Sequence, residues 1–164
     1  MPIGHCLAKS YFDAADFVMM LDALFVVLGL WAFMTRDRED NGPELSTMTS
    51  AFIGLPAGFL AKYGTGVKWS VTTAMVLSSA SCLAWVHSII VSVQFMGKVR
   101  EEFDEGLISV PSSYWPFQWV NVLILIVITL NHLILSSYCF RRLKEMRAGN
   151  RLPVDDKDGV DGIL

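Results

Sequence analysis

The sequence predicts an all-α membrane protein, an antiparallel bundle of four transmembrane helices with both termini on the inner side. Apolar residues make up 53% of the 164 residues and charged residues only 18%, and the mean hydropathy is +0.46. These apolar residues gather in long runs instead of recurring at the period of a half-exposed helix or strand. A chain this short cannot bury several such runs within itself, so we expect lipid to surround them.

Four apolar segments are long enough to be considered as spans. The first, residues 15–34, has about 20 residues, which at 1.5 Å per residue crosses ~30 Å of hydrocarbon. The second, residues 47–62, is shorter and contains Pro56, so we expect a thin or re-entrant span with a helical kink or break at the proline. The third, 69–96, and the fourth, 116–140, have the length and apolarity of full spans.

These spans form one transmembrane domain over residues 15–140. A short inner segment, 1–14, precedes it. A basic juxtamembrane stretch begins at residue 141 and passes into an acidic tail that ends at residue 164. The tail contains too few apolar residues to fold alone, so we expect it to be disordered.

The distribution of basic residues predicts the orientation, because Lys and Arg are retained on the cytoplasmic side of short connections. With both termini inside, the inner segments carry nine basic residues and the two outer loops carry four. The nine are Lys9, Lys62, Lys68, Arg141, Arg142, Lys144, Arg147, Arg151 and Lys157. Tyr and Trp residues at the expected headgroup levels agree with this orientation; Trp85 is the exception, in the middle of a span.

Two polar residues within the spans are expected at similar depth. Asp22 lies about seven residues from the inner end of the first span, and His132, beside Asn131, lies about eight residues from the inner end of the fourth. A buried acid needs a partner, a proton or water. We favour a structural pin between helices, or a position near the headgroups, over a proton relay or cation site.

A second polar contact is expected between the outer halves of the third and fourth spans, through His87 and Asn121. Asn121 and His132 are about three helical turns apart, so both belong to one face of the fourth span. The histidines lack the Cys or Glu spacing of a metal site, and no metal is predicted.

Small residues recur at intervals of four on the second and third spans, which allows close helix packing. They are Gly54, Gly58, Ala74, Ser78 and Cys82. Packing within the chain is favoured over an interface with a partner subunit.

Two cysteines, Cys6 and Cys139, are expected near the inner membrane surface, where reversible palmitoylation is possible. The polar residues supply no phosphate loop, nucleophile with an adjacent base, or paired catalytic carboxylates. We therefore predict no enzymatic activity and no cofactor. The expected partners are membrane lipids, with other membrane-protein subunits or further copies of the chain, and no nucleic acid.

The arrangement of four spans, with a tight inner turn (YGTGVKW) between the second and third, resembles the membrane-spanning four-domain family that includes the B-lymphocyte antigen. MARVEL proteins share this layout. The third span (VKWSVTTAMVLSSASCLAWVHSII) is similar in texture to that of the four-domain family. The resemblance implies a role in membrane organisation or association with partners, and it carries over no functional residue.

Two functions are therefore expected as alternatives. The first is a non-enzymatic accessory or scaffolding subunit of a larger assembly in the plasma membrane or an organellar membrane. The second is a small oligomeric ion or proton channel or transporter that uses Asp22 and His132.

Overall fold

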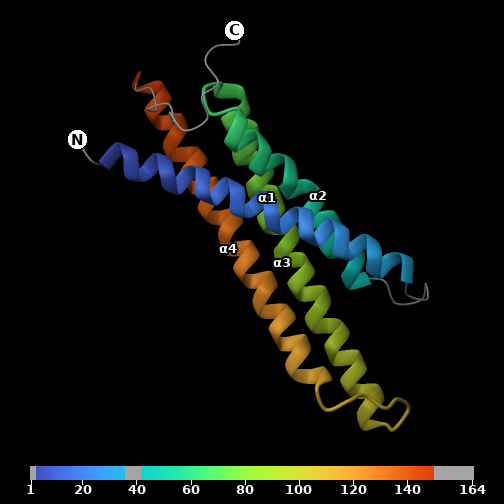
Figure 1. Ribbon diagram of the computed structural model, residues 1–164. Coiled ribbons are helices and arrows are strands. Elements are labelled where there is room, and N and C mark those ends of the chain that lie inside the picture. Colours follow the sequence, from blue (N-terminus) through green and yellow to red (C-terminus); the bar gives the residue numbers. More distant parts are fainter. Residues whose placement is uncertain (1–2, 36–41, 150–164) are drawn as a thin grey trace.

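The computed structural model describes residues 3–35 and 42–149, and most of these residues belong to four helices (Figure 1). In chain order they are α1 (Ile3–Thr35), α2 (Gly42–Tyr63), α3 (Lys68–Asp104) and α4 (Tyr114–Arg147). The described residues contain no strand. The all-helical fold class is therefore confirmed.

Three of the four helices contain stretches that are long and apolar enough to cross a membrane. These stretches are Tyr11–Ala32, Lys68–Asp104 and Tyr114–Arg147. Helix α2 is not among them, because its Ser, Thr, Gly and Pro residues lower its hydropathy. The three apolar helices are compatible with a membrane protein, and a complete crossing by α2 stays a prediction.

Each predicted span lies inside one helix, but the helices extend beyond the spans. Helix α1 begins at Ile3 instead of residue 15, and α3 continues to Asp104, beyond residue 96. The basic residues after 140 belong to α4, which continues to Arg147. Lys, Arg, Glu and Met favour helix as strongly as most apolar residues do, so a helix need not end where its apolar run ends. The tail predicted to be disordered lies outside the described residues from residue 150 on.

Helix α2 continues through Pro56 without a break. Proline removes one backbone hydrogen bond from a helix and crowds the preceding turn, which was the reason to expect a kink or break. Packing on both sides of α2 offsets this effect, because α2 lies between α1 and α3 and contacts both along its length.

The four helices run alternately up and down, so that the start of α1 and the end of α4 lie at the same end of the bundle (Figure 1). A core cluster at this end joins residues from all four helices, among them Tyr11 of α1, Ala61 of α2, Val71 of α3 and Cys139 of α4. Helix α4 packs along α3 and closes the bundle against α1. A second cluster around Trp85 lies farther along the bundle.

The interior of the bundle combines apolar side chains with an unusual number of small and polar residues, while many other large apolar side chains face outward. Buried positions on α3 are spaced alternately three and four residues apart, the repeat by which helices pack along a left-handed seam. They include Ala74, Ser78, Ser81, Trp85, Ser88 and Ser92. By contrast, Val27, Leu83 and Leu123 are all more than half exposed. This inverts the distribution of a water-soluble protein, and apolar surroundings would suit it.

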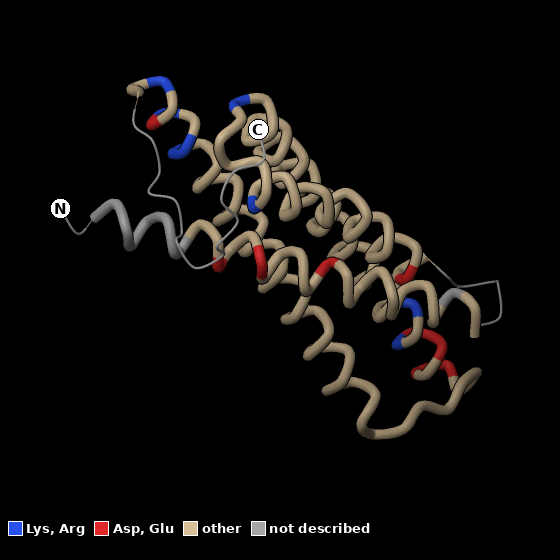
Figure 2. Tube along the Cα trace, turned by 45° about the horizontal axis from the view of Figure 1, so that its top comes forward, with Lys and Arg blue, Asp and Glu red and all other residues tan. Residues whose placement is uncertain are grey.

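Charged residues concentrate at the two ends of the bundle (Figure 2). Lys and Arg occupy the α2–α3 turn and the last turns of α4, and a mixed set of acids and bases occupies the end of α3. Between these ends Asp22 is a fully buried acid.

Candidate functional site: a buried acid and imidazole

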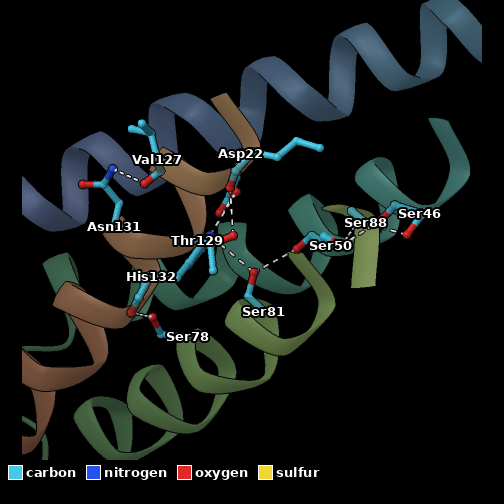
Figure 3. A network of polar contacts seen from close by, with 11 residues as sticks. Asp22, Ser46, Ser50, Ser78, Ser81, Ser88, Val127, Thr129, Asn131 and His132 are labelled. Carbon is cyan, nitrogen blue, oxygen red and sulfur yellow. Dashed lines mark hydrogen bonds and ion pairs between the residues drawn. The ribbon is translucent and has the colours of Figure 1, made fainter. Parts of the chain in front are cut away.

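Asp22 of α1 and His132 of α4 meet in the interior of the bundle (Figure 3). The Oδ1 atom of Asp22 lies 3.3 Å from Nε2 of His132, and neither side chain has any exposed surface. Both residues occupy seam positions, since Ala15, Val18 and Asp22 on α1 follow the same three-and-four spacing as Ile128 and His132 on α4. The helix geometry that packs the apolar residues therefore also brings the acid to the imidazole.

Helix α3 supplies two hydroxyl groups that hold this pair. Ser78 donates to the backbone carbonyl of His132 at 2.7 Å, which fixes α4 against α3 at this level. Ser81 lies 3.3 Å from Nε2 of His132 and donates its own proton to the carbonyl of Ser50, at 3.0 Å. Because the Ser81 hydroxyl proton already forms the bond to Ser50, the Ser81 oxygen can only accept a hydrogen bond from the imidazole. The hydrogen-bond pattern thus assigns a proton to Nε2, where it is shared between Ser81 and Asp22.

Gly54 of α2 forms the fourth wall of the site. A Cβ atom at this position would lie 2.6 Å from Cε1 of His132 and 2.7 Å from Oγ of Ser81, and closer still to Oδ2 of Asp22. A Cβ atom does not approach another non-bonded heavy atom this closely. Only glycine therefore allows α2 to pack directly against the acid and the imidazole.

Three polar atoms around the site have no hydrogen-bond partner among the described residues. They are Oδ2 of Asp22, Nδ1 of His132 and Nε1 of Trp85. A buried polar atom without a partner destabilises a fold by about 1–3 kcal/mol, more if it is charged. The pair therefore retains two atoms, Oδ2 of Asp22 and Nδ1 of His132, that could accept a proton without first breaking an existing hydrogen bond.

Trp85 of α3 forms an aromatic wall beside the imidazole. Its ring stacks on that of His132 with 6.4 Å between centroids and 24° between planes, and it makes a T-shaped contact with Phe25 at a centroid distance of 5.4 Å. Trp85 is completely buried. Trp85, the one Trp expected in the middle of a span and not at a headgroup level, therefore belongs to the site. This mid-span position is the sequence signal that could have identified it.

A row of serines leads from this site toward the end of the bundle where α1 connects to α2 (Figure 3). The Ser50 hydroxyl lies 3.0 Å from that of Ser88, which lies 2.9 Å from that of Ser46. Ser46 in turn lies 3.1 Å from Nδ1 of His87, an exposed residue. Sequence reasoning missed these serines, although Ser81 and Ser88 continue the seven-residue spacing that begins at Ala74.

Among the described residues no hydrogen bond joins His87 to Asn121, so the polar contact expected between them is not observed. Its ring hydrogen-bonds instead to the Ser46 hydroxyl of α2, which also lies within hydrogen-bond distance of the Ser88 hydroxyl of α3. Asn121 is half-buried. Asn131, beside His132, turns away from the pair and donates to the carbonyl of Val127 at 2.7 Å.

The predicted small residues lie mainly at helix contacts within the chain. Gly58 packs on α1, where an added Cβ would lie 3.0 Å from the carbonyl oxygen of Ala15 and 2.6 Å from Cγ of Met19. Ala74 and Ser78 have no exposed surface, and Cys82 is half-buried.

The burial of Cys139 argues against the possible palmitoylation of this residue in the folded chain. This cysteine has no exposed surface and lies in the core cluster, with its sulfur 4.0 Å from the Tyr11 hydroxyl. That hydroxyl also donates to the carbonyl of Ala61 at 2.8 Å, which holds the ring over the cysteine. An acylating enzyme cannot reach such a thiol. The side chain of Cys6 lies outside the described residues.

Among the side chains that the structure describes, no three His, Cys, Asp or Glu residues come together as a metal site would require. The chain matches no family model, no curated protein and no solved structure. The resemblance to the four-domain and MARVEL families therefore stays an expectation. The residues that the structure describes form four helices, three of which contain stretches long and apolar enough to span a membrane.

Proposed function

We propose that this chain is a four-span integral membrane protein whose buried Asp22–His132 pair takes part in proton transfer through the bundle. The proposal of four crossings rests on the antiparallel arrangement. If α1 and α3 cross the membrane in one direction, α2 runs between them in the other, and its 22 residues give a length of about 33 Å. That length matches the hydrocarbon core.

The proposed orientation places the start of α1 and the end of α4 on the inner side. It is supported by Arg141, Lys144 and Arg147 in the last two turns of α4, together with Lys62 and Lys68 on either side of the α2–α3 turn. Basic residues near the ends of spans are retained on the cytoplasmic side. The same orientation directs the serine row, and its exposed His87, toward the outer side.

The observation that carries the proton-transfer proposal is the contact between two titratable side chains inside the bundle, with polar atoms left unused on both. Ionisable residues within spans are rare because they are costly to bury, and they commonly mark proton pathways in transporters and pumps. Serine hydroxyls can both donate and accept a proton. The hydroxyls from Ser50 to Ser46 supply one section of a path toward the exposed imidazole of His87. Ser81 reaches Ser50 only through its backbone carbonyl, so the proposal requires a proton to cross from the pair to the Ser50 hydroxyl by a rearrangement of these hydrogen bonds.

Proton flux in proteoliposomes tests this function. Purified full-length protein is reconstituted with a pH-sensitive dye inside, and a pH gradient is applied across the membrane. We expect the wild-type chain to dissipate the gradient and Asp22→Asn to reduce the rate at least tenfold, because the amide cannot take up and release the proton. Asp16→Asn is the matched control. It alters an acid on the same helix that is half exposed and paired with Lys62, so the rate should stay within twofold of wild type.

The proposal fails if wild-type protein conducts no faster than empty liposomes, or if Asp22→Asn conducts as wild type does. Thermal unfolding of each variant in mild detergent is measured in parallel. A loss of flux counts only if the variant remains folded at the assay temperature.

An accessory or scaffolding role is the second candidate, and one observation favours it. The site joins all four helices, since α1 and α4 supply the pair, α3 supplies Ser78 and Ser81, and α2 supplies Gly54 and the Ser50 carbonyl. A network of this kind can have a purely structural role, in which it fixes the register of the helices and transfers no proton. In that case Asp22→Asn lowers the unfolding temperature, no variant carries flux, and crosslinking in native membranes recovers stoichiometric partner subunits.

A further inference from the structure

A groove on the outer surface of the bundle, between α3 and α4, combines an apolar wall with two cations at one end. It encloses about 650 Å³ and lies near the end of the bundle where α4 terminates. Met75 and Val76 of α3 and Phe140 of α4 form its apolar part, and Arg141 and Lys144 of α4 form its charged end. It is separate from the buried polar site, which lies inside the bundle.

The two cations face the groove without an acidic partner among the described residues. The neighbouring Arg142 pairs with Glu145 and donates to the carbonyl of Thr65, whereas no ion pair within residues 3–35 and 42–149 involves Arg141 or Lys144. Both side chains are exposed. Two unpaired cations one helical turn apart suit a phosphate group, which accepts several charge-assisted hydrogen bonds.

The apolar wall continues from the cations toward the middle of the bundle. Val76 is 57% exposed and Phe140 is 62% exposed, so both present surface to whatever fills the groove. The floor is closed by a hydrogen bond of 2.8 Å between the hydroxyls of Ser79 and Ser136. Since Ser79 also donates to the carbonyl of Met75, the serines are satisfied by the protein and need no donor or acceptor from a ligand.

We propose that this groove binds one anionic phospholipid, with its phosphate held between Arg141 and Lys144 and an acyl chain lying against Val76 and Phe140. Helix geometry supports this alignment, because Ser137 lies about 6 Å deeper along α4 than Arg141 and leads the chain away from the charged end. With the membrane orientation proposed above, the groove opens into the inner leaflet, where anionic lipids are concentrated. Binding itself does not depend on that orientation.

Native mass spectrometry of the full-length protein tests the proposal. The protein is delipidated in mild detergent and given equal amounts of phosphatidylglycerol and phosphatidylcholine with identical acyl chains. We expect one phosphatidylglycerol to be retained per chain in preference to phosphatidylcholine. Each basic residue near an anionic headgroup contributes a factor of about five to the affinity, so Arg141→Gln/Lys144→Gln should weaken retention about thirtyfold.

Two further variants separate a groove from a general attraction of basic helix ends for anionic lipid. Lys68→Gln/Arg147→Gln removes the same charge from exposed positions at the same end of the bundle but outside the groove, and it should leave retention within threefold of wild type. Val76→Trp fills the apolar part while keeping both cations, and it should weaken retention at least fivefold. The proposal is overturned if the two double variants lose phosphatidylglycerol retention equally, if Val76→Trp retains phosphatidylglycerol as wild type does, or if wild type retains both lipids alike. Because the measurement involves no flux, these outcomes are independent of the proton-transfer proposal.

Discussion

At the scale of single residues, the buried polar site depends on a position that has no side chain. Gly54 allows α2 to approach the carboxylate of Asp22, the imidazole of His132 and the hydroxyl of Ser81 at once. Any larger residue would push α2 away from all three helices that supply those groups. The closeness of the helices, and hence the burial of the acid, follows from this glycine.

Replacing Gly54 with Ala should therefore destabilise the bundle, even though Ala is the better helix former. The added methyl group would overlap the polar atoms of the site, and overpacking of this kind costs about 1–3 kcal/mol. Equilibrium unfolding in mixed detergent micelles measures the change. We expect Gly54→Ala to unfold at a clearly lower denaturant fraction than wild type.

Gly97→Ala is the matched control for this substitution. Gly97 lies within α3, is exposed, and has no atom within 4 Å of an added Cβ. The gain in helix propensity, up to about 1 kcal/mol, should appear there without opposition. Equal stability of Gly54→Ala and wild type would show that α2 does not pack against the acid and the imidazole as closely as described.

At the scale of helices, the sequence predicts the segments well and their partners only in part. Four apolar runs identify four helices, because lipid-facing surfaces are apolar over their whole length. The contact of Asp22 with His132 could be expected from depth alone. The contact of His87 with Ser46 could not, because depth does not say which of two neighbouring helices a side chain faces.

The residues at which the helices end could not be predicted from hydropathy either. Hydropathy locates the part of a helix that suits lipid, whereas the helix itself ends where backbone hydrogen bonding stops. Helix α4 therefore continues through the basic residues to Arg147, and α3 continues through Glu101 and Glu102 to Asp104. The serine row was missed for a related reason, since single serines are common in spans and only their shared seam makes them a network.

The register of α3 against α4 can be tested by an engineered disulfide. The hydroxyl oxygens of Ser79 and Ser136 are 2.8 Å apart, so cysteines at both positions should bring their Cβ atoms within the range that a disulfide allows. The native cysteines are replaced with Ala, and a protease site is introduced into the loop between Asp104 and Tyr114. After cleavage, we expect the halves of Ser79→Cys/Ser136→Cys to remain joined until a reductant is added.

Ser79→Cys/Ser137→Cys provides the comparison for this crosslink. Ser137 is one residue farther along α4 and so about 100° around the helix, and its hydroxyl bonds to the carbonyl of Leu133 instead of crossing to α3. This pair should separate after cleavage. More efficient crosslinking of this second pair would mean that α4 is rotated relative to the described arrangement.

At the scale of the whole molecule, the distribution of surface is the property that most constrains its environment. Serines, small residues and one acid–imidazole pair share the interior with buried apolar side chains, and many large apolar side chains lie on the outside of the described helices. In water this surface would be exposed at high cost, whereas in lipid it is the favoured arrangement. The sequence predicts this inversion through its composition, but only the assembled helices show which apolar residues face outward.

The number of crossings is decided by α2, whose composition alone does not identify it as a span. It packs between α1 and α3 in the antiparallel sense, and that arrangement favours a complete crossing in a lipid environment. A hydrophobic window averages over residues such as Gly54 and Ser50 that are buried against other helices. Such residues lower the hydropathy of α2 without facing lipid.

Single-cysteine labelling with a membrane-impermeant maleimide tests four crossings against three. In a chain whose native cysteines are replaced with Ala, Leu107→Cys lies in the exposed α3–α4 loop and Thr65→Cys lies in the α2–α3 turn at the opposite end of the bundle. We expect Leu107→Cys to react in intact cells or sealed organelles, and Thr65→Cys and tags at both chain ends to react only after permeabilisation. A complete crossing by α2 requires both ends to share a face, because an even number of spans returns the chain to its starting side. Termini that react from opposite faces would mean that α2 does not cross, and would remove the orientation on which the leaflet of the phospholipid groove depends.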